Sequence, residues 1–249
     1  MKKNTIVTPD EILSILDDLQ IQKGSCICVQ ASDQFCKHVV GQAQAILNLL
    51  MERVGTQGCL FMPSFSISTL DPSCIPTDIE YENWKKIRDW QLGYHPILTS
   101  CDQNGMIVNQ FLKNENVIRT SHPVYSFAFW GNYKEKEINQ RPNYPLSFTH
   151  VLSSFANRQA INLLFDIEPE ESVLLPAIAK TLNKGVTSLQ RAVIKKGKNN
   201  TIKTFLVTEI PEIKEELLGY CYRKEAVIDK YTIHRISLDE IQETEAEID

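Results

Sequence analysis

The sequence lacks the features of several large classes of protein. It has no apolar run long enough to cross a membrane, and its first five residues are too polar for a signal peptide. It also has no basic tract, and its formal net charge of −5 argues against nucleic acid as the main partner. We therefore expect a cytoplasmic protein that binds neither a membrane nor a nucleic acid.

The seven cysteines form no pattern typical of a metal site or of a disulfide framework. Cys26 and Cys28 are separated by one residue and have no matching pair elsewhere, which argues against zinc. Their number is odd and most lie among apolar residues, as is usual for reduced thiols in the cytoplasm. We predict no bound metal.

The order of helical and strand patterns predicts an α/β fold. With 249 residues, 43% of them apolar, the chain can bury a full core. We predict a single domain over residues 1–249: a layered α/β/α core with a mixed sheet, a long inserted loop and a C-terminal β-hairpin. The predicted strands are 25–29, 59–62, 124–130, 160–165 and 231–236, and residues 186–194 and 201–207 form the hairpin. The predicted helices follow Thr8 and span 39–53, 105–113, 151–155, 173–182, 213–218 and 238–249.

Residues 67–104, called the inserted segment below, have few regular patterns but many aromatic side chains. Among them are Trp84, Trp90 and Tyr94. A long loop of this composition inside a compact domain is more often a wall of a substrate site than a linker. Earlier in the chain, the loop 30–33 and the helix opening near Gly41 form a strand–loop–helix arrangement that offers backbone N–H groups to an anion.

The segment 119–131 is the most unusual part of the chain. It packs an imidazole, hydroxyl groups, a proline and four aromatic rings into thirteen residues. Pro123 biases His122 away from the helical region, which places the imidazole on an extended entry to a strand. The residues alone fit two interpretations equally well: a structural turn whose polar groups are hydrogen-bonded within the fold, and a functional site.

Three segments together resemble the aminoglycoside 3-N-acetyltransferase family. They are Val-Val-Gly-Gln-Ala-Gln-Ala at 39–45 with the helix that follows, Met-Pro-Ser-Phe at 62–65, and Arg-Thr-Ser-His-Pro-Val-Tyr-Ser-Phe at 119–127. The last is similar to the family signature Arg-x-x-His-Pro-x-x-Ser-Phe, and the resemblance covers nearly the whole chain. It implies acetyl-CoA or CoA as the co-substrate and a small amine acceptor such as a nucleotide or an amino sugar.

The resemblance also implies a coenzyme site. In the first loop, where the family typically has Val-His-Ser-Ser-Leu, Ser32 is the only matching hydroxyl and Gln30 replaces histidine. Val39, Val40 and Gly41 match the turn that opens the coenzyme-facing helix. His122 and Ser126 match the signature and would line the cleft near the pantetheine arm.

The chain departs from the family where the general base should stand. Members usually show Gly-x-Gly-x₄-Thr-x₂-His-x₂-Glu after the strand that matches 161–164. In the same register this chain has Phe165, Ile167, Ser172, Leu175 and Ile178. Leu175 thus replaces the histidine expected to take the proton from the amine. We therefore expect no acetylation of deoxystreptamine amines.

Two groups remain as candidates for the base. His122 is the imidazole in a matching motif, and Asp166 begins an acidic run with Glu168, Glu170 and Glu171. Such a run is usually a solvated loop, but near the aromatic side chains of the inserted segment it would attract a protonated amine. Three functions stay open: an N-acyltransferase of an amino sugar or related amine, an acyltransferase with a different acceptor, and a catalytically silent relative that acts as a binding or partner protein.

Overall fold

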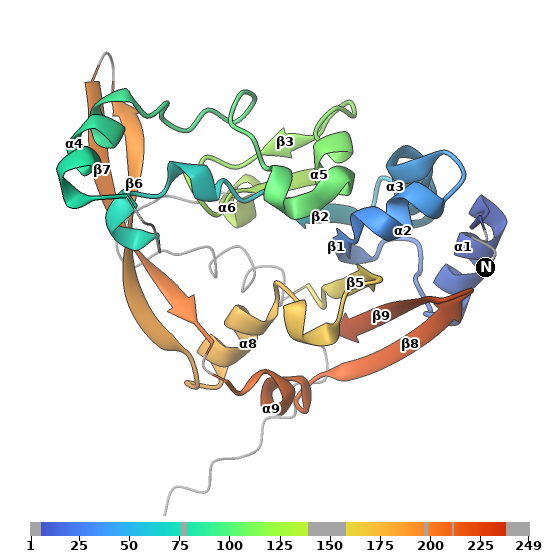
Figure 1. Ribbon diagram of the computed structural model, residues 1–249. Coiled ribbons are helices and arrows are strands. Elements are labelled where there is room, and N and C mark those ends of the chain that lie inside the picture. The colour runs from blue at the N-terminus through green and yellow to red at the C-terminus, as the bar shows by residue number, and fades with distance from the viewer. Residues whose placement is uncertain (1–5, 76–78, 139–157, 197–198, 211, 238–249) are drawn as a thin grey trace, which may run out of the picture.

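In a computed structural model, the described residues are 6–75, 79–138, 158–196, 199–210 and 212–237. They form a seven-stranded mixed sheet and a separate two-stranded hairpin (Figure 1). The strands are β1 Cys26–Ala31, β2 Cys59–Pro63, β3 Ile118–Arg119, β4 Phe127–Gly131, β5 Ile161–Phe165, β6 Val186–Lys196, β7 Asn199–Glu209, β8 Tyr222–Ile228 and β9 Tyr231–Ser237. The helices are α1 Pro9–Asp18, α2 Asp33–His38, α3 Gln42–Val54, α4 Tyr81–Trp90, α5 Gly105–Phe111, α6 Glu135–Ile138, α8 Leu175–Thr181 and α9 Lys214–Leu218. Over this part of the chain, no helix is both long and apolar enough to cross a membrane.

The order of strands in the large sheet is β3-β4-β2-β1-β5-β9-β8. β1 pairs in parallel with both β2 and β5, whereas β4 and β9 pair antiparallel with their neighbours. The carboxyl ends of the three parallel strands therefore meet at one edge of the sheet. In open α/β sheets this edge is where ligands usually bind.

Side chains alternate between the two faces of each central strand. On β1, Ile27 and Val29 pack with α1, α2, α3 and α5, while Cys26 and Cys28 pack with α8, α9 and the hairpin. The sheet is thus covered by helices on both faces, and the predicted layered α/β fold with a mixed sheet and a hairpin is confirmed.

The structure differs from the sequence prediction in several elements. The helix predicted over 39–53 begins at Gln42, and the residues before it form a separate helix, α2. The strand predicted over 124–130 begins at Phe127, because the residues after His122 form a turn. The inserted segment contains α4, and strands β3 and β8 were not predicted. The predicted helices at 151–155 and 238–249 lie outside the described residues.

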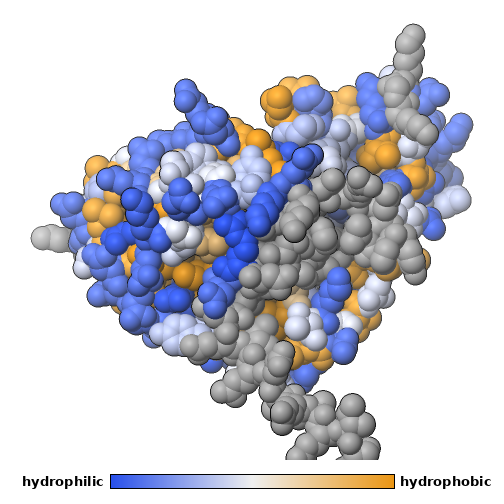
Figure 2. Space-filling model, turned by 180° about the vertical axis from the view of Figure 1, so that it is seen from behind, coloured by the Kyte–Doolittle hydropathy of each residue, from blue (hydrophilic) through white to orange (hydrophobic). Residues whose placement is uncertain are grey.

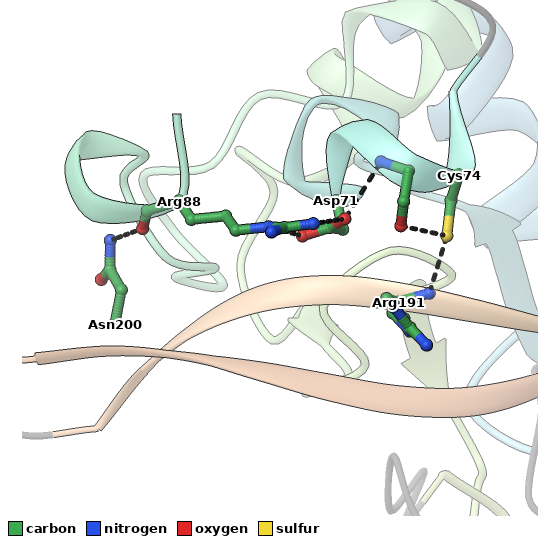
Figure 3. Close-up of polar contacts among 6 residues, drawn as sticks. Asp71, Cys74, Arg88, Arg191 and Asn200 are labelled. Atoms are coloured by element: carbon green, nitrogen blue, oxygen red, sulfur yellow. Dashed lines mark hydrogen bonds and ion pairs between the residues drawn. The ribbon is translucent and has the colours of Figure 1, made fainter. Parts of the chain in front are cut away.

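The hairpin of β6 and β7 is fastened to the inserted segment (Figure 3). The backbone N–H of Asp71 donates to the carbonyl of Arg191 at 2.9 Å, and the N–H of Arg191 donates to Cys74 Sγ at 3.2 Å. At the other end, Asn200 Nδ2 donates to the carbonyl of Arg88 at 2.9 Å. Two segments more than a hundred residues apart in sequence are therefore joined by hydrogen bonds, each of which involves at least one backbone group.

An ion pair between Asp71 and Arg88 connects the two parts of the inserted segment that bind the hairpin. Arg88 binds the carboxylate through two nitrogens, with Nε–Oδ2 and Nη2–Oδ1 distances of 2.7 and 2.9 Å, and the Asp71 side chain is fully buried. Hydrogen bonds from Arg88 lower the pKa of Asp71 to about 2. A folded-state pKa below the ordinary value means that the pair stabilises the fold above about pH 4. This stabilisation is lost as the pH falls toward 2.

Replacing Asp71 with asparagine should lower the free energy of unfolding at pH 7 by about 2 kcal/mol, since the charge-assisted bonds disappear. Urea denaturation at pH 7 measures the loss, which should shrink below pH 4 as the wild-type carboxylate becomes protonated. The matched control is Asp17→Asn, because Asp17 pairs with Arg53 at 2.7 Å but is 65% exposed. Its replacement should cost less than about 1 kcal/mol. Equal losses from the two substitutions would contradict the prediction.

Candidate functional site

A cavity of about 370 Å³ lies at the carboxyl ends of β1, β2 and β5, and we call it the strand-end cavity. Ser32, which follows β1, lies in its wall. Its Oγ accepts the N–H of Phe35 at 3.0 Å and so caps α2, and it donates to Asp166 Oδ2 at 2.5 Å. The structure thus brings together two residues predicted from the sequence, Ser32 and Asp166, from the ends of neighbouring parallel strands.

Asp166 is held in an unusual backbone conformation. Its φ of 56° lies in the left-handed region, where aspartate and asparagine are tolerated better than most residues. Its N–H donates to the carbonyl of Thr232 on β9, at 2.9 Å. The carboxylate is half-buried and is directed at the hydroxyl of Ser32.

A carboxylate that lines the strand-end cavity, Asp33, was missed by the sequence reasoning. Asp33 lines the cavity, and its Oδ1 accepts the N–H of Met106 at 2.6 Å, at the start of α5. Gly105 makes this approach possible, since its φ is +82° and an added Cβ would lie 2.9 Å from that oxygen. Asp33 therefore fixes α5 against the cavity.

The turn at residues 39–41 opens α3 beside a second cavity of about 320 Å³, called the α3 cavity. Val39 is buried and pairs with Val7, whereas Val40 is half exposed. Gly41 has a φ of 81°, and no side chain caps the helix that follows it. The α3 cavity lies between α3 and α5, and Lys113 is the charged residue among those that line it. A helix N-terminus and a lysine together suit an anion such as a phosphate.

The signature segment forms a hydrogen-bonded centre around Arg119. Its Nε donates to Ser126 Oγ at 3.0 Å, and its Nη2 donates to Ser64 O and Ser66 Oγ, both at 2.6 Å. Its Nη1 donates to the carbonyl of Thr99 at 2.5 Å. Arg119 thereby joins β3, the segment after β2 and the inserted segment, so the signature and the Met-Pro-Ser-Phe segment bind each other.

This arrangement leaves Ser126 without access to a coenzyme. Its side chain is fully buried, and its Oγ donates to Ser64 O at 2.7 Å while accepting from Arg119. The predicted contact of Ser126 with the pantetheine arm is not supported by this geometry, because the hydroxyl is both buried and saturated.

His122 is also buried, with 1% of its surface exposed. Its Nδ1 accepts the N–H groups of Val124 and Tyr125 at 3.2 and 2.9 Å, so the ring proton lies on Nε2. Phe205 packs edge-on against the ring, with 4.8 Å between the two ring centroids. Burial lowers the pKa of His122 to about 3. A ring with no free lone pair is a poor base, so the geometry favours a structural role for His122 over the predicted catalytic one.

The position of the family base lies in the apolar core. Leu175 is fully buried among Val173, Leu174 and Ile178, and it faces no cavity described above. Gln30, which stands where the family has a histidine, uses both ends of its amide. Its Nε2 donates to Glu171 O at 3.0 Å and its Oε1 accepts the N–H of Val173 at 2.9 Å, so it links β1 to the chain before α8.

The aromatic side chains of the inserted segment and the acidic run, which we predicted to form one wall of the acceptor site, do not form a single surface. Of the described residues that line the strand-end cavity, none is Trp84, Trp90 or Tyr94. Tyr94 instead packs on Arg119 and donates its hydroxyl to Thr120 O. No member of the acidic run lines the strand-end cavity, and Asp166 is connected to it through Ser32. Lys113 and Asp33 were missed because an isolated charged residue carries no signal in the sequence.

Comparisons with known proteins agree with the fold. The profile described as aminoglycoside 3-N-acetyltransferase matches residues 29–243. A Bacillus subtilis protein, the SPbeta prophage-derived aminoglycoside N(3')-acetyltransferase-like protein YokD, is 33% identical over 137 residues. That alignment covers 54% of this chain and only 50% of YokD.

Solved structures show the same fold over most of the chain. The crystal structure of YokD matches with a TM-score of 0.83 and 23% identity, over 97% of this chain and 94% of that one. The apoenzyme of aminoglycoside acetyltransferase AAC(3)-IVa matches with a TM-score of 0.73, 18% identity and coverage of 97% and 87%. AAC-IIIb in its binary complex with CoASH matches with a TM-score of 0.72, 13% identity and coverage of 95% and 94%. Since the family profile spans most of the sequence, the chain belongs to the aminoglycoside 3-N-acetyltransferase family.

Proposed function

We propose that this chain is a CoA-dependent N-acyltransferase, which transfers an acetyl group to the amine of a small acceptor such as an amino sugar. The observation that carries the proposal is the hydrogen bond between Ser32, which lies in the wall of a cavity at the carboxyl ends of parallel strands, and Asp166 behind it. The α3 cavity lies on the other side of α5 and offers a helix N-terminus with Lys113 to phosphates. Membership of the family and the relative solved with CoASH support the same co-substrate.

Acetyl-CoA would supply the acetyl group as a thioester. Asp166 would then serve as the base, acting through Ser32. The Ser32 proton already points at Asp166, and Ser32 Oγ receives one donor, the N–H of Phe35. A further lone pair of this oxygen is therefore available to the proton that leaves the acceptor nitrogen. In this relay the amine proton passes to Ser32 as the Ser32 proton passes to Asp166.

Replacing Asp166 with asparagine should reduce the rate of thiol release from acetyl-CoA by about 10²- to 10⁴-fold, as expected for loss of a general base. Asparagine tolerates the left-handed backbone at this position, so the fold should be kept. The control is Glu171→Gln in the same acidic run, because the exposed Glu171 pairs with Lys214 at 3.1 Å, whereas Asp166 accepts the hydroxyl of Ser32. Unchanged turnover in Asp166→Asn would exclude Asp166 as the base.

Replacing Gly41 with alanine should weaken binding of CoA by at least about tenfold in titration calorimetry. The left-handed φ and a Cβ only 2.9 Å from Ala45 would shift the start of α3. The matched control is Gly24→Ala, since Gly24 has a similar φ of +85° but no atom within 4 Å of the added Cβ. That variant should bind CoA like the wild type. If the wild-type protein shows no heat with millimolar CoA or acetyl-CoA, the acyltransferase proposal fails.

A second function, that of a catalytically silent relative, is favoured by one group of observations. The family base position is a fully buried leucine, Gln30 is saturated by backbone groups, and both His122 and Ser126 are occupied within the fold. A silent relative would bind CoA without transferring its acyl group to any amine. A panel of amino sugars and nucleotide-linked amines, assayed for thiol release, separates the two functions.

A further inference from the structure

A third cavity lies between the inserted segment and the hairpin, and we call it the loop cavity. Its volume is about 660 Å³, larger than the two cavities above, and it is lined by residues of the loop after α4 and by Lys195 of β6. In Figure 1, α4 and the β6–β7 hairpin lie side by side at this end of the molecule. A cavity of this size can hold a small organic ligand.

The loop cavity is a different site from the strand-end cavity. Thr99 and Ser100 line the loop cavity, whereas Gln103 and Asn104 line the strand-end cavity. The chain between them is held in place, since Arg119 binds the carbonyl of Thr99 and Asn104 Nδ2 donates to Phe65 O at 2.9 Å. The proposed coenzyme and acceptor reactions therefore leave this cavity unexplained.

Much of the wall of the loop cavity is apolar and unusually exposed. Leu92 and Leu98 line it and are 84% and 80% exposed, and Tyr94 adds an aromatic ring. Exposed Trp90 and Ile97 lie next to these residues in sequence. Figure 2 shows hydrophobic residues among hydrophilic ones at the upper right, over the end of the molecule that holds α4 and the hairpin. Exposed apolar groups that gather around a cavity are typical of a ligand site.

The polar groups of the cavity define the charge of its ligand. Lys195 provides a cation, and no carboxylate is found among the described residues that line the cavity. His95 Nδ1 accepts the N–H groups of Ile97 and Leu98, both at 3.2 Å, which leaves Nε2–H as a donor.

We propose that the loop cavity binds a small molecule with an apolar body and a neutral or anionic polar end. The acceptor or anionic group of this molecule faces Lys195 and His95. Polycations such as aminoglycosides are disfavoured, because the wall offers them a lysine and no carboxylate. The proposal is independent of the acyl-transfer function.

The first test uses 1-anilinonaphthalene-8-sulfonate, an apolar anion whose fluorescence reports binding. The full chain should bind it at one site, and Leu98→Asp should weaken binding by about tenfold, by removing an apolar contact and adding a negative charge. Ile97→Asp is the matched control, because Ile97 is 85% exposed and adjacent in sequence but does not line the cavity. The Ile97→Asp variant should bind the dye with the affinity of the wild type. Equal effects of the two substitutions, or no binding at all, would overturn the proposal.

The second test compares ligands of opposite charge and similar shape. 4-Phenylbutyrate should displace the dye at a concentration about three- to tenfold lower than 4-phenylbutylamine, and Lys195→Ala should remove this difference. Lys37→Ala, on the exposed face of α2, should preserve it. Saturating CoA should leave the dye bound. A preference for the amine, or a preference that survives Lys195→Ala, would refute the anionic site, and displacement by CoA would show that the dye reports the coenzyme site instead.

Discussion

Lowering the pH from 7 to 4.5 should destabilise the wild-type protein by about 2–3 kcal/mol more than it destabilises His122→Asn. Burial holds the pKa of His122 at about 3 in the folded protein, whereas the unfolded chain has a value near 6.5. Below pH 6.5 the unfolded state therefore binds a proton that the folded state does not accept. Stability is lost as the pH falls from about 6.5 toward 3, and urea denaturation at several pH values measures the slope.

Asparagine is the informative replacement for His122, because its Oδ1 can accept the N–H groups two and three residues later as Nδ1 does. The chain contains its own control. His95 also precedes a proline and accepts two N–H groups in the same way, but its ring is exposed. His95→Asn should leave the pH dependence of stability unchanged. If His122→Asn keeps that dependence but loses all turnover, His122 acts in catalysis and the structural assignment is wrong.

Replacing Arg119 with methionine should lower the free energy of unfolding by about 4 kcal/mol, because several carbonyl and hydroxyl acceptors would lose a charged donor together. Methionine retains much of the apolar stem but none of the hydrogen bonds. The same substitution should weaken CoA binding, since Arg119 positions the end of the inserted segment that continues into the strand-end cavity. Denaturation and calorimetry measure the two effects.

Arg53→Met is the control for this prediction. Arg53 has one ion pair on the surface, with Asp17 at 2.7 Å, and a long contact of 3.5 Å to Leu13 O, so its loss should cost less than about 1 kcal/mol. Arg119→Lys should recover little of the lost stability, because an ammonium group cannot reach acceptors on three segments at once. Full stability in either Arg119 variant would show that the centre around Arg119 is not essential to the fold.

The elements that could be predicted from the sequence are those with an apolar face. The buried strands β1, β2 and β5 and the helices α1 and α3 follow from such patterns, and so does the hairpin from its turn residues. Helix α4 could not be found in this way, because none of its residues is buried and its fixed points are the distant Asp71 and Asn200. Strand β8 alternates exposed and half-buried residues at the edge of the sheet, and three consecutive charged side chains, Arg223, Lys224 and Glu225, interrupt its apolar pattern.

The site was predictable in part. Ser32 was predicted from the resemblance and Asp166 from the acidic run at the place of the missing motif, and the structure places the two side chains in contact. The roles of His122 and Ser126 could not be read from the signature, because a structural network and a catalytic site both require polar residues at fixed spacing. Only the positions of their partners show that His122 Nδ1 and Ser126 Oγ are already used within the fold.

The burial of Leu175 in the apolar core determines what a histidine at this position could do. Gln30 ties β1 to the segment before α8, and Ser172 Oγ donates to Asn162 Oδ1 at 2.6 Å beneath it. Restoring histidine at position 175 would therefore place an imidazole in the apolar core and not in a cleft. Placing a histidine of this position in a cleft would need several coordinated substitutions, because the contacts of Gln30 and Ser172 hold the segment before α8 closed.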